Sequence, residues 1–196
     1  MTFYNIIFGI LFLGAVGQFF HIVFESSNFN FMTLPSFWMV ATLTLVVFND
    51  VIYTTQVLED PPTDKRKEYT LSMKLLDLLS FMLLCAALLV LAPSDNILSV
   101  KIKTDLLQES REFFFWLLLT VYWATAIIWN IAGKVYPDSS SGKIRWMLMV
   151  MLILSGFLSL ANFFHFPGTI LWILRVFILL YMCSYFLLYK YFVFRK

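Results

Sequence analysis

The distribution of apolar residues along the chain predicts six membrane-spanning helices. Each apolar stretch is about 20 residues long, and a helix of that length crosses a hydrocarbon core of about 30 Å. Prolines occur between these stretches and not within them, as expected because proline removes a helix hydrogen bond. Four spans would remain if two of the stretches lay flat on the membrane or fused. The predicted spans are residues 3–24, 36–58, 70–92, 113–134, 145–164 and 169–190.

The composition supports this interpretation. Of the 196 residues, 61% are hydrophobic and 13% are charged, whereas about a quarter of the residues in soluble domains are charged. These side chains are too few to cover a water-soluble fold of this size. The first stretch has no basic residue before its apolar core, so we expect a retained span and not a cleaved signal peptide. The fold class is therefore predicted to be all-α, with one transmembrane helical domain over residues 1–196.

The basic residues predict the orientation of the helices. With six spans, both termini lie on the same side as the loops around residues 59–69 and 135–144. Ten Lys and Arg residues lie near that side, and three lie near the other. Because cytoplasmic loops are enriched in Lys and Arg, we expect both termini in the cytoplasm. The expected location is a multi-pass position in a bacterial inner (plasma) membrane.

Ionisable residues within the predicted spans indicate a candidate intramembrane site. Asp50 and Asp77 lie about eight residues from the cytoplasmic ends of the second and third spans, roughly 12 Å deep. Lys74 precedes Asp77 by one turn on the same helix face. Two interpretations are open. The site binds a small cation or relays a proton, or Lys74 neutralises the carboxylates and fixes two helices together. Asn49 and Tyr53 are further candidates for this site.

A second set of polar residues follows one face of the first predicted span. Gly14, Gly17, Gln18, His21 and Glu25 recur there at helical spacing. Small and polar residues on a common face allow membrane helices to pack closely. Arg175 in the sixth span has a depth similar to that of Gln18, and we expect it to contact this stripe. Helix packing is favoured over a pH-sensing role for the stripe.

The chain also contains a weak internal repeat. An offset of 78 residues aligns residues 37–65 with residues 115–143, and six of the 29 aligned positions are identical. Two spans separate the copies, so they would run parallel. The second copy has Ile128 in place of Asp50. Because a symmetric transport site should keep its charges, this loss favours the structural interpretation of the acidic site.

The sequence contains no catalytic or cofactor motif. Two histidines and no cluster of carboxylates give no basis for a metal site, and nucleotide-binding loops are absent. The leading hypothesis is a non-catalytic membrane subunit that oligomerises, or that anchors or regulates a partner complex. One alternative is a cation or proton channel or transporter that uses Asp50, Lys74 and Asp77. A third is an interfacial lipid-modifying enzyme that uses Asp60 or Asp138.

The basic turns on the predicted cytoplasmic side are candidate contacts for a partner protein or for anionic lipid. No nucleic-acid partner is expected, and no cofactor is expected. The residues concerned are Lys65, Arg66, Lys67, Lys143 and Arg145.

Overall fold

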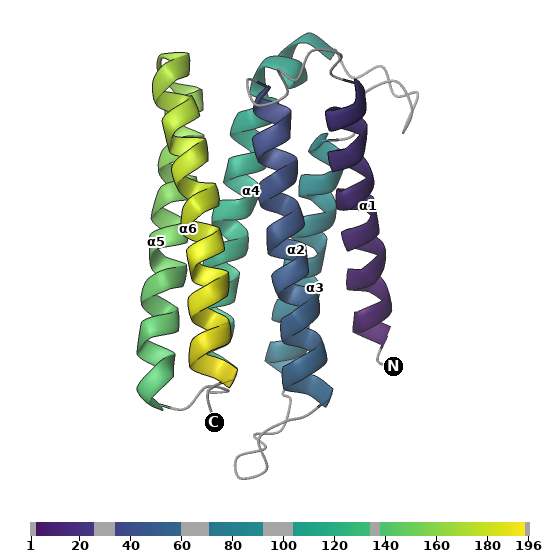
Figure 1. The fold of residues 1–196 in the computed structure, drawn as a ribbon, viewed down its shortest axis with the longest axis vertical. Coiled ribbons are helices and arrows are strands. Elements are labelled where there is room, and N and C mark those ends of the chain that lie inside the picture. Colours follow the sequence, from purple (N-terminus) through teal and green to yellow (C-terminus); the bar gives the residue numbers. More distant parts are fainter. Residues whose placement is uncertain (1–2, 26–33, 60–70, 92–103, 134–137, 195–196) are drawn as a thin grey trace.

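The computed structural model describes residues 3–25, 34–59, 71–91, 104–133 and 138–194, and these residues form six α-helices. The helices stand side by side in one bundle, and α1 begins at the same end at which α6 finishes (Figure 1). We call this end the lower end, and the end at which α5 turns into α6 the upper end. The helices are α1 (Phe3–Glu25), α2 (Pro35–Glu59), α3 (Leu71–Leu91), α4 (Thr104–Gly133), α5 (Asp138–Phe163) and α6 (Gly168–Phe194).

Four helices in the described part of the chain are long and apolar enough to cross a membrane. Their apolar segments are Leu71–Leu91, Arg111–Ala132, Gly142–Phe163 and Gly168–Tyr185, from α3, α4, α5 and α6. The described apolar segments of α1 and α2, Gly9–Phe24 and Pro35–Val51, are shorter. Four long apolar helices suggest an integral multi-pass membrane protein.

Two helices extend well beyond the apolar stretches that predicted them. The fourth predicted span began at residue 113, but α4 begins at Thr104, nine residues earlier. The fifth began at residue 145, whereas α5 begins at Asp138. Hydropathy identifies the part of a helix that lipid can surround, while helix hydrogen bonds continue equally well through polar residues. The extension of α4 places Glu112 inside a helix and not in a loop.

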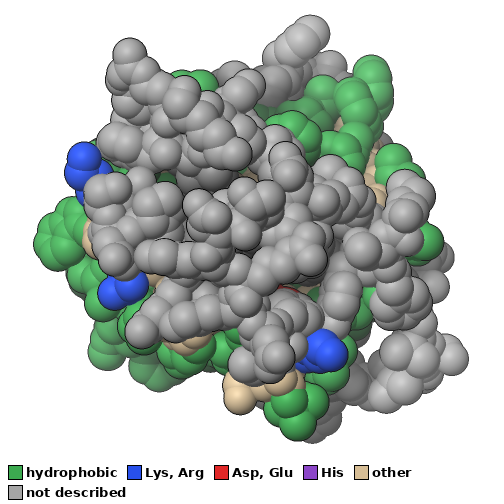
Figure 2. Space-filling model, turned by 90° about the horizontal axis from the view of Figure 1, so that it is seen from below, with side chains coloured by type: hydrophobic (Ala, Val, Ile, Leu, Met, Phe, Trp, Pro, Cys, Tyr) green, Lys and Arg blue, Asp and Glu red, His purple; other side chains and the backbone are tan. Residues whose placement is uncertain are grey.

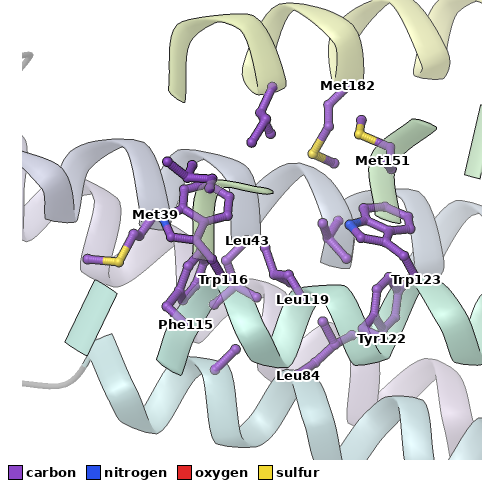
Figure 3. Packing of buried hydrophobic residues seen from close by; sticks show 14 of the residues in the cluster. Met39, Leu43, Leu84, Phe115, Trp116, Leu119, Tyr122, Trp123, Met151 and Met182 are labelled. Atoms are coloured by element: carbon purple, nitrogen blue, oxygen red, sulfur yellow. The ribbon is translucent and has the colours of Figure 1, made fainter. Parts of the chain in front are cut away.

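Helix α4 is the centre of the bundle. It packs along α3 and α5 and also contacts α2, while α6 packs on α5 and α2, and α1 packs on α2 and α3. Buried side chains recur along α4 every three or four residues, as expected for a helix that is enclosed by neighbours. Figure 3 shows these side chains directed between the helices. The buried residues of α4 include Phe115, Trp116, Leu119, Tyr122, Trp123 and Ile127.

The opposite face of α4 is apolar and exposed. Phe114, Leu117, Val121 and Ile128 are on this face, at helical spacing. In water such a stripe would destabilise the fold, whereas in a bilayer lipid tails solvate it. The exposed apolar face is therefore consistent with a helix that meets lipid on one side and protein on the other.

The described part of the internal repeat lies in α2 and α4, which run parallel. Phe37 and Trp38 are buried, and their rings meet edge to face with centroids 5.3 Å apart. Phe115 and Trp116 make the same kind of contact at 5.1 Å. Towards the lower end the similarity is lost, because Asp50 is half-buried and its counterpart is exposed. A duplication of this segment stays a prediction.

Candidate functional site

Asp50 of α2 lies inside the bundle against α4. The hydroxyl of Tyr122 donates a hydrogen bond of 2.6 Å to its Oδ1. Tyr122 is only 3% exposed, so this bond joins two helices in a region that water does not reach from the Tyr122 side. A short bond from a phenol to a carboxyl group is among the stronger uncharged-donor bonds. The hydrogen bond thereby holds the Asp50 carboxyl group of α2 in a fixed position against α4.

Asp77 of α3 is the second acidic group at this level. It is half-buried on α3, which packs along α4 and also contacts α2. Asn49 precedes Asp50 on α2, and its buried Oδ1 accepts no hydrogen bond from the described residues. The structure thus brings together acids from α2 and α3 around one side of α4.

Lys74 is a further member of the predicted acidic site. It lies in the first turn of α3, and its side chain is exposed. The side chain of Tyr53 lies outside the described residues.

Further polar side chains of α4 bond to α5. The hydroxyl of Thr120 donates to Oγ of Ser155 at 3.1 Å, and Oγ of Ser159 donates to the backbone carbonyl of Phe113 at 3.2 Å. Near the lower end, Nε of Arg145 donates to Oδ1 of Asn130 at 2.9 Å. Small hydroxyl residues let two helices approach closely and bond directly. These contacts tie α4 to α5 along most of their shared length.

The predicted stripe on α1 divides between two environments. Gly14 packs against α3, because a Cβ atom there would lie 3.1 Å from Cδ2 of Leu88. Gln18 is half-buried, whereas Gly17 and His21 are exposed. The side chain of Glu25 lies outside the described residues. Half of this stripe therefore faces away from the bundle.

Arg175 has a different partner from the one that the sequence suggested. Its Nε and Nη2 donate to the two carboxylate oxygens of Glu112, each at 2.6 Å. The indole N–H of Trp116 adds a bond of 3.3 Å to Oε1 of Glu112. Side-chain exposure is 6% for the arginine and 13% for the glutamate. The result is a bidentate ion pair, largely withdrawn from water, which joins α6 to α4 near the upper end.

The reason for this difference is the arrangement of the helices. Arg175 and Gln18 have similar depths, but α1 packs on α2 and α3, whereas α6 packs on α5 and α2. Depth along a helix does not define which helices are neighbours. Glu112 precedes the fourth predicted span, which begins at residue 113, so hydropathy gives no sign that it lies on a helix inside the bundle.

The turn between α5 and α6 brings His165 to the upper end. The amide of Phe166 donates to the carbonyl of Ala161 at 2.9 Å, and the amide of His165 donates to that of Asn162 at 3.1 Å. This pair of bonds is the Schellman arrangement that closes many helices, and glycine usually occupies its left-handed position. Here His165 occupies it, with φ of 52°. Among the described non-glycine residues, no other has a positive φ.

A pocket of about 420 Å³ opens beside this turn. It lies between the beginning of α2, the upper part of α4, the end of α5 and the beginning of α6. Polar side chains from three of these elements line it. They are Ser36, Arg111, Glu112, Asn162 and His165.

The candidate cytoplasmic contacts are only partly described. Lys143 is exposed and Arg145 is half-buried at the lower end. Figure 2 views the bundle from this end, with separate Lys and Arg side chains beside hydrophobic ones. Lys65, Arg66 and Lys67 lie outside the described residues, as does Asp60. The side chain of Asp138, the first residue of α5, is also not described.

Sequence reasoning missed several residues that the structure brings into these sites. Tyr122 and Asn130 lie within the fourth predicted span, and apolar patterning does not distinguish them from its other residues. A phenol at the depth of Asp50 is nevertheless a signal for a hydrogen-bonded contact. Arg111 and Glu112 were treated as loop residues. Among the described residues, no group of three or more His, Cys, Asp or Glu is arranged to hold a metal ion.

Comparisons with models of known protein families, with characterised proteins and with solved structures give no match to this chain.

Proposed function

We propose that this chain is a six-span membrane protein that works as a non-catalytic subunit, in contact with further copies of itself or with a partner complex. The outward face of α1 is the observation that carries the proposal. A Cβ atom added at Gly17 would have nothing within 4 Å. His21, one turn further on, is exposed. The flanking residues on this face are large and apolar: Ile10, Leu13, Phe20 and Phe24.

A glycine next to an imidazole is unusual on a helix surface that meets only lipid. Polar side chains within a membrane normally face protein and not lipid. A second helix can cover this face if it can approach closely, and a residue without a side chain permits that approach. Gly17 provides the space, and His21 provides a polar group for the contact. We therefore place the interface of the subunit on this face of α1.

The use of polar side chains elsewhere supports a non-catalytic role. Tyr122, Thr120 and Asn130 of α4 bond to α2 and α5, and Glu112 bonds to α6. Side chains that are fixed in contacts between helices are poorly suited to exchange partners during a reaction. The described interior thus has the character of a scaffold.

The oligomeric state in a mild detergent tests this proposal. Mass photometry of the full chain should give a protein mass of at least twice 22.9 kDa, or a complex with a co-purifying partner. Gly17→Leu fills the space needed for the contact and should shift the distribution to the single chain. Gly142→Leu is the matched control, because Gly142 also has nothing within 4 Å but lies at the lower end of α5. A parent protein that is a clean monomer without a partner would refute the proposal.

The second candidate function is conduction of protons or small cations past Asp50 and Asp77. The observation in its favour is that α2 and α3, which are in contact with each other and with α4, each carry an acid, and that the phenol of Tyr122 is bonded to one of them, Asp50. Acids within a membrane are costly to keep and often mark ion pathways. Flux into liposomes should fall in Asp50→Asn, in Asp77→Asn and in Lys74→Met, and Ser184→Ala serves as a control at an exposed position of α6. If the asparagine variants conduct like the parent, the acids are structural.

The proposed topology places the lower end, with both termini, in the cytoplasm of a bacterial inner membrane. The described bases support it, because Lys74, Lys143 and Arg145 lie towards that end. A thiol placed at the end of the chain should react with a membrane-impermeant reagent only after the cells are opened. In this orientation the basic turns would contact a cytoplasmic partner or anionic lipid. An interfacial lipid-modifying activity, the third hypothesis, would require Asp60 or Asp138 for turnover.

A further inference from the structure

The pocket beside the α5–α6 turn lies at the boundary of the apolar part of the bundle. The apolar segment of α4 begins at Arg111, that of α5 ends at Phe163, and that of α6 begins at Gly168. The lining residues Arg111 and His165 are therefore at or just beyond this boundary. In a membrane this is the level of the lipid headgroups. The pocket thus opens where phosphate groups of lipids are concentrated.

The polar wall of the pocket is suited to an anion. Arg175 neutralises the carboxylate of Glu112 through two hydrogen bonds, so this acid does not oppose a bound anion as a lone charge would. Arg111 contributes a guanidinium group, whose five N–H donors can bind a ligand in addition to a protein neighbour. Ser36 contributes a hydroxyl in the first turn of α2, where the helix dipole also favours negative charge.

The backbone at His165 points to the same use. A non-glycine residue in the left-handed region is strained, and glycine would occupy this Schellman position without strain. The chain nevertheless has an imidazole there, and the imidazole lines the pocket. Strained residues that persist in a fold are concentrated at binding sites.

The remaining wall is apolar. Met39 and Leu171 are buried, and Phe166 lies at the turn. A pocket of about 420 Å³ is larger than a phosphate ion needs, and its apolar side can contact the glycerol backbone and the first methylene groups of a lipid. Polar donors on one side and apolar residues on the other match an amphipathic anion.

We infer that this pocket binds the phosphate group of an anionic phospholipid, with Arg111 and His165 as the residues that contact the phosphate. Binding at this position would bridge α2, α4 and the α5–α6 turn, and so would stabilise the upper end of the bundle.

Lipid titration of the full chain in detergent micelles tests the inference. The probes are phosphatidylglycerol, diacylglycerol with the same acyl chains, and glycerol 3-phosphate, and the readout is lipid-bound mass in native mass spectrometry. Phosphatidylglycerol should bind most tightly. Arg111→Gln should raise its Kd at least tenfold, because a hydrogen bond to a charged group contributes about 1.5–3 kcal/mol and a tenfold change corresponds to about 1.4 kcal/mol. Lys143→Gln, which removes an exposed charge at the lower end, should not change it.

His165→Gly separates binding from folding. Glycine suits the turn, so this variant should fold at least as well as the parent and yet bind phosphatidylglycerol several-fold more weakly. Equal affinity in the parent, Arg111→Gln and His165→Gly would overturn the inference. Diacylglycerol that binds as tightly as phosphatidylglycerol would overturn the role of the phosphate. Glycerol 3-phosphate that binds as tightly as the lipid would overturn the lipid assignment in favour of a soluble phosphate ester.

Discussion

Removal of the Glu112 carboxylate should be among the most destabilising single changes in the bundle. Glu112→Leu deletes both bonds to Arg175 and leaves a guanidinium with 6% side-chain exposure without its anion. Each charge-assisted bond contributes about 1.5–3 kcal/mol, and loss of one partner of a buried pair costs about 3–5 kcal/mol. Because Glu112 is 13% exposed near the upper end, we expect the lower part of this range, about 3 kcal/mol.

The reciprocal change should cost less. Arg175→Leu leaves Glu112 near the upper end, where water can reach part of it and where the indole of Trp116 still donates to Oε1. We expect a loss of about 2 kcal/mol, on the same principle that an unpaired charge is expensive in proportion to its burial. The double variant removes both charges, and an apolar pair of similar volume is often as stable as a buried ion pair. It should therefore be more stable than Glu112→Leu.

Reversible unfolding in mixed micelles, followed by circular dichroism, measures these differences as a double-mutant cycle. We expect a coupling energy of at least about 1.5 kcal/mol between the two positions. Ser184→Ala is the control, because this exposed hydroxyl bonds only within α6, to the carbonyl of Leu180. Its stability should be within about 0.5 kcal/mol of the parent. Single variants that each cost less than this, with additive effects, would refute the view that the ion pair holds α6 to α4.

Substitutions at three further positions test individual contacts. His165→Gly should raise the midpoint of thermal unfolding by roughly 1–4 °C. It removes about 1–2 kcal/mol of left-handed strain, of which the entropy cost of glycine offsets about 0.5–1 kcal/mol. A lower midpoint would contradict the strain argument. Tyr122→Phe should destabilise the bundle by about 1–3 kcal/mol, because the Asp50 carboxyl group loses its donor, and micelle unfolding that is unchanged would show that this bond is dispensable. Gly156→Ala should leave the free energy of unfolding nearly unchanged, since its Cβ would lie 3.5 Å from Cγ2 of Thr120, an ordinary contact distance. Gly156→Leu should lower it by about 1–3 kcal/mol, because the larger side chain overpacks α4 against α5. Equal stabilities of the two variants would contradict the close packing.

The helices were largely predictable from the sequence, and the reason is physical. An apolar run of 20 residues has few stable arrangements other than a helix that crosses or adjoins a bilayer. The early start of α4 at Thr104 was not predictable in this way, because its first turns contain polar residues that hydropathy assigns to a loop. The periodicity of apolar residues indicates which face of a helix is buried. The length of the apolar run indicates only the part of the helix that lies within lipid.

The candidate sites were predictable only in part. The equal depths of Asp50 and Asp77 follow from counting residues along two consecutive antiparallel helices, which a short connection forces to be neighbours. The partner of Arg175 could not be obtained by the same counting. Several helices present polar groups at a similar depth, and only the order of packing selects among them. Glu112 and Tyr122 were missed because each lies on α4, whose central position becomes visible only in three dimensions.

The polar residues of this protein differ in what surrounds them, and this difference separates structural from binding roles. Tyr122, Thr120 and Glu112 bond to side chains of other helices, so their removal should lower stability whether or not a ligand is present. Arg111 and His165 line an open pocket, so their removal should lower ligand affinity, and His165→Gly should do so without lowering the stability of the ligand-free protein. His165 combines a left-handed backbone conformation, which glycine adopts without strain, with a side chain that lines the pocket. The position of His165 is therefore the strongest argument that the upper end binds a ligand.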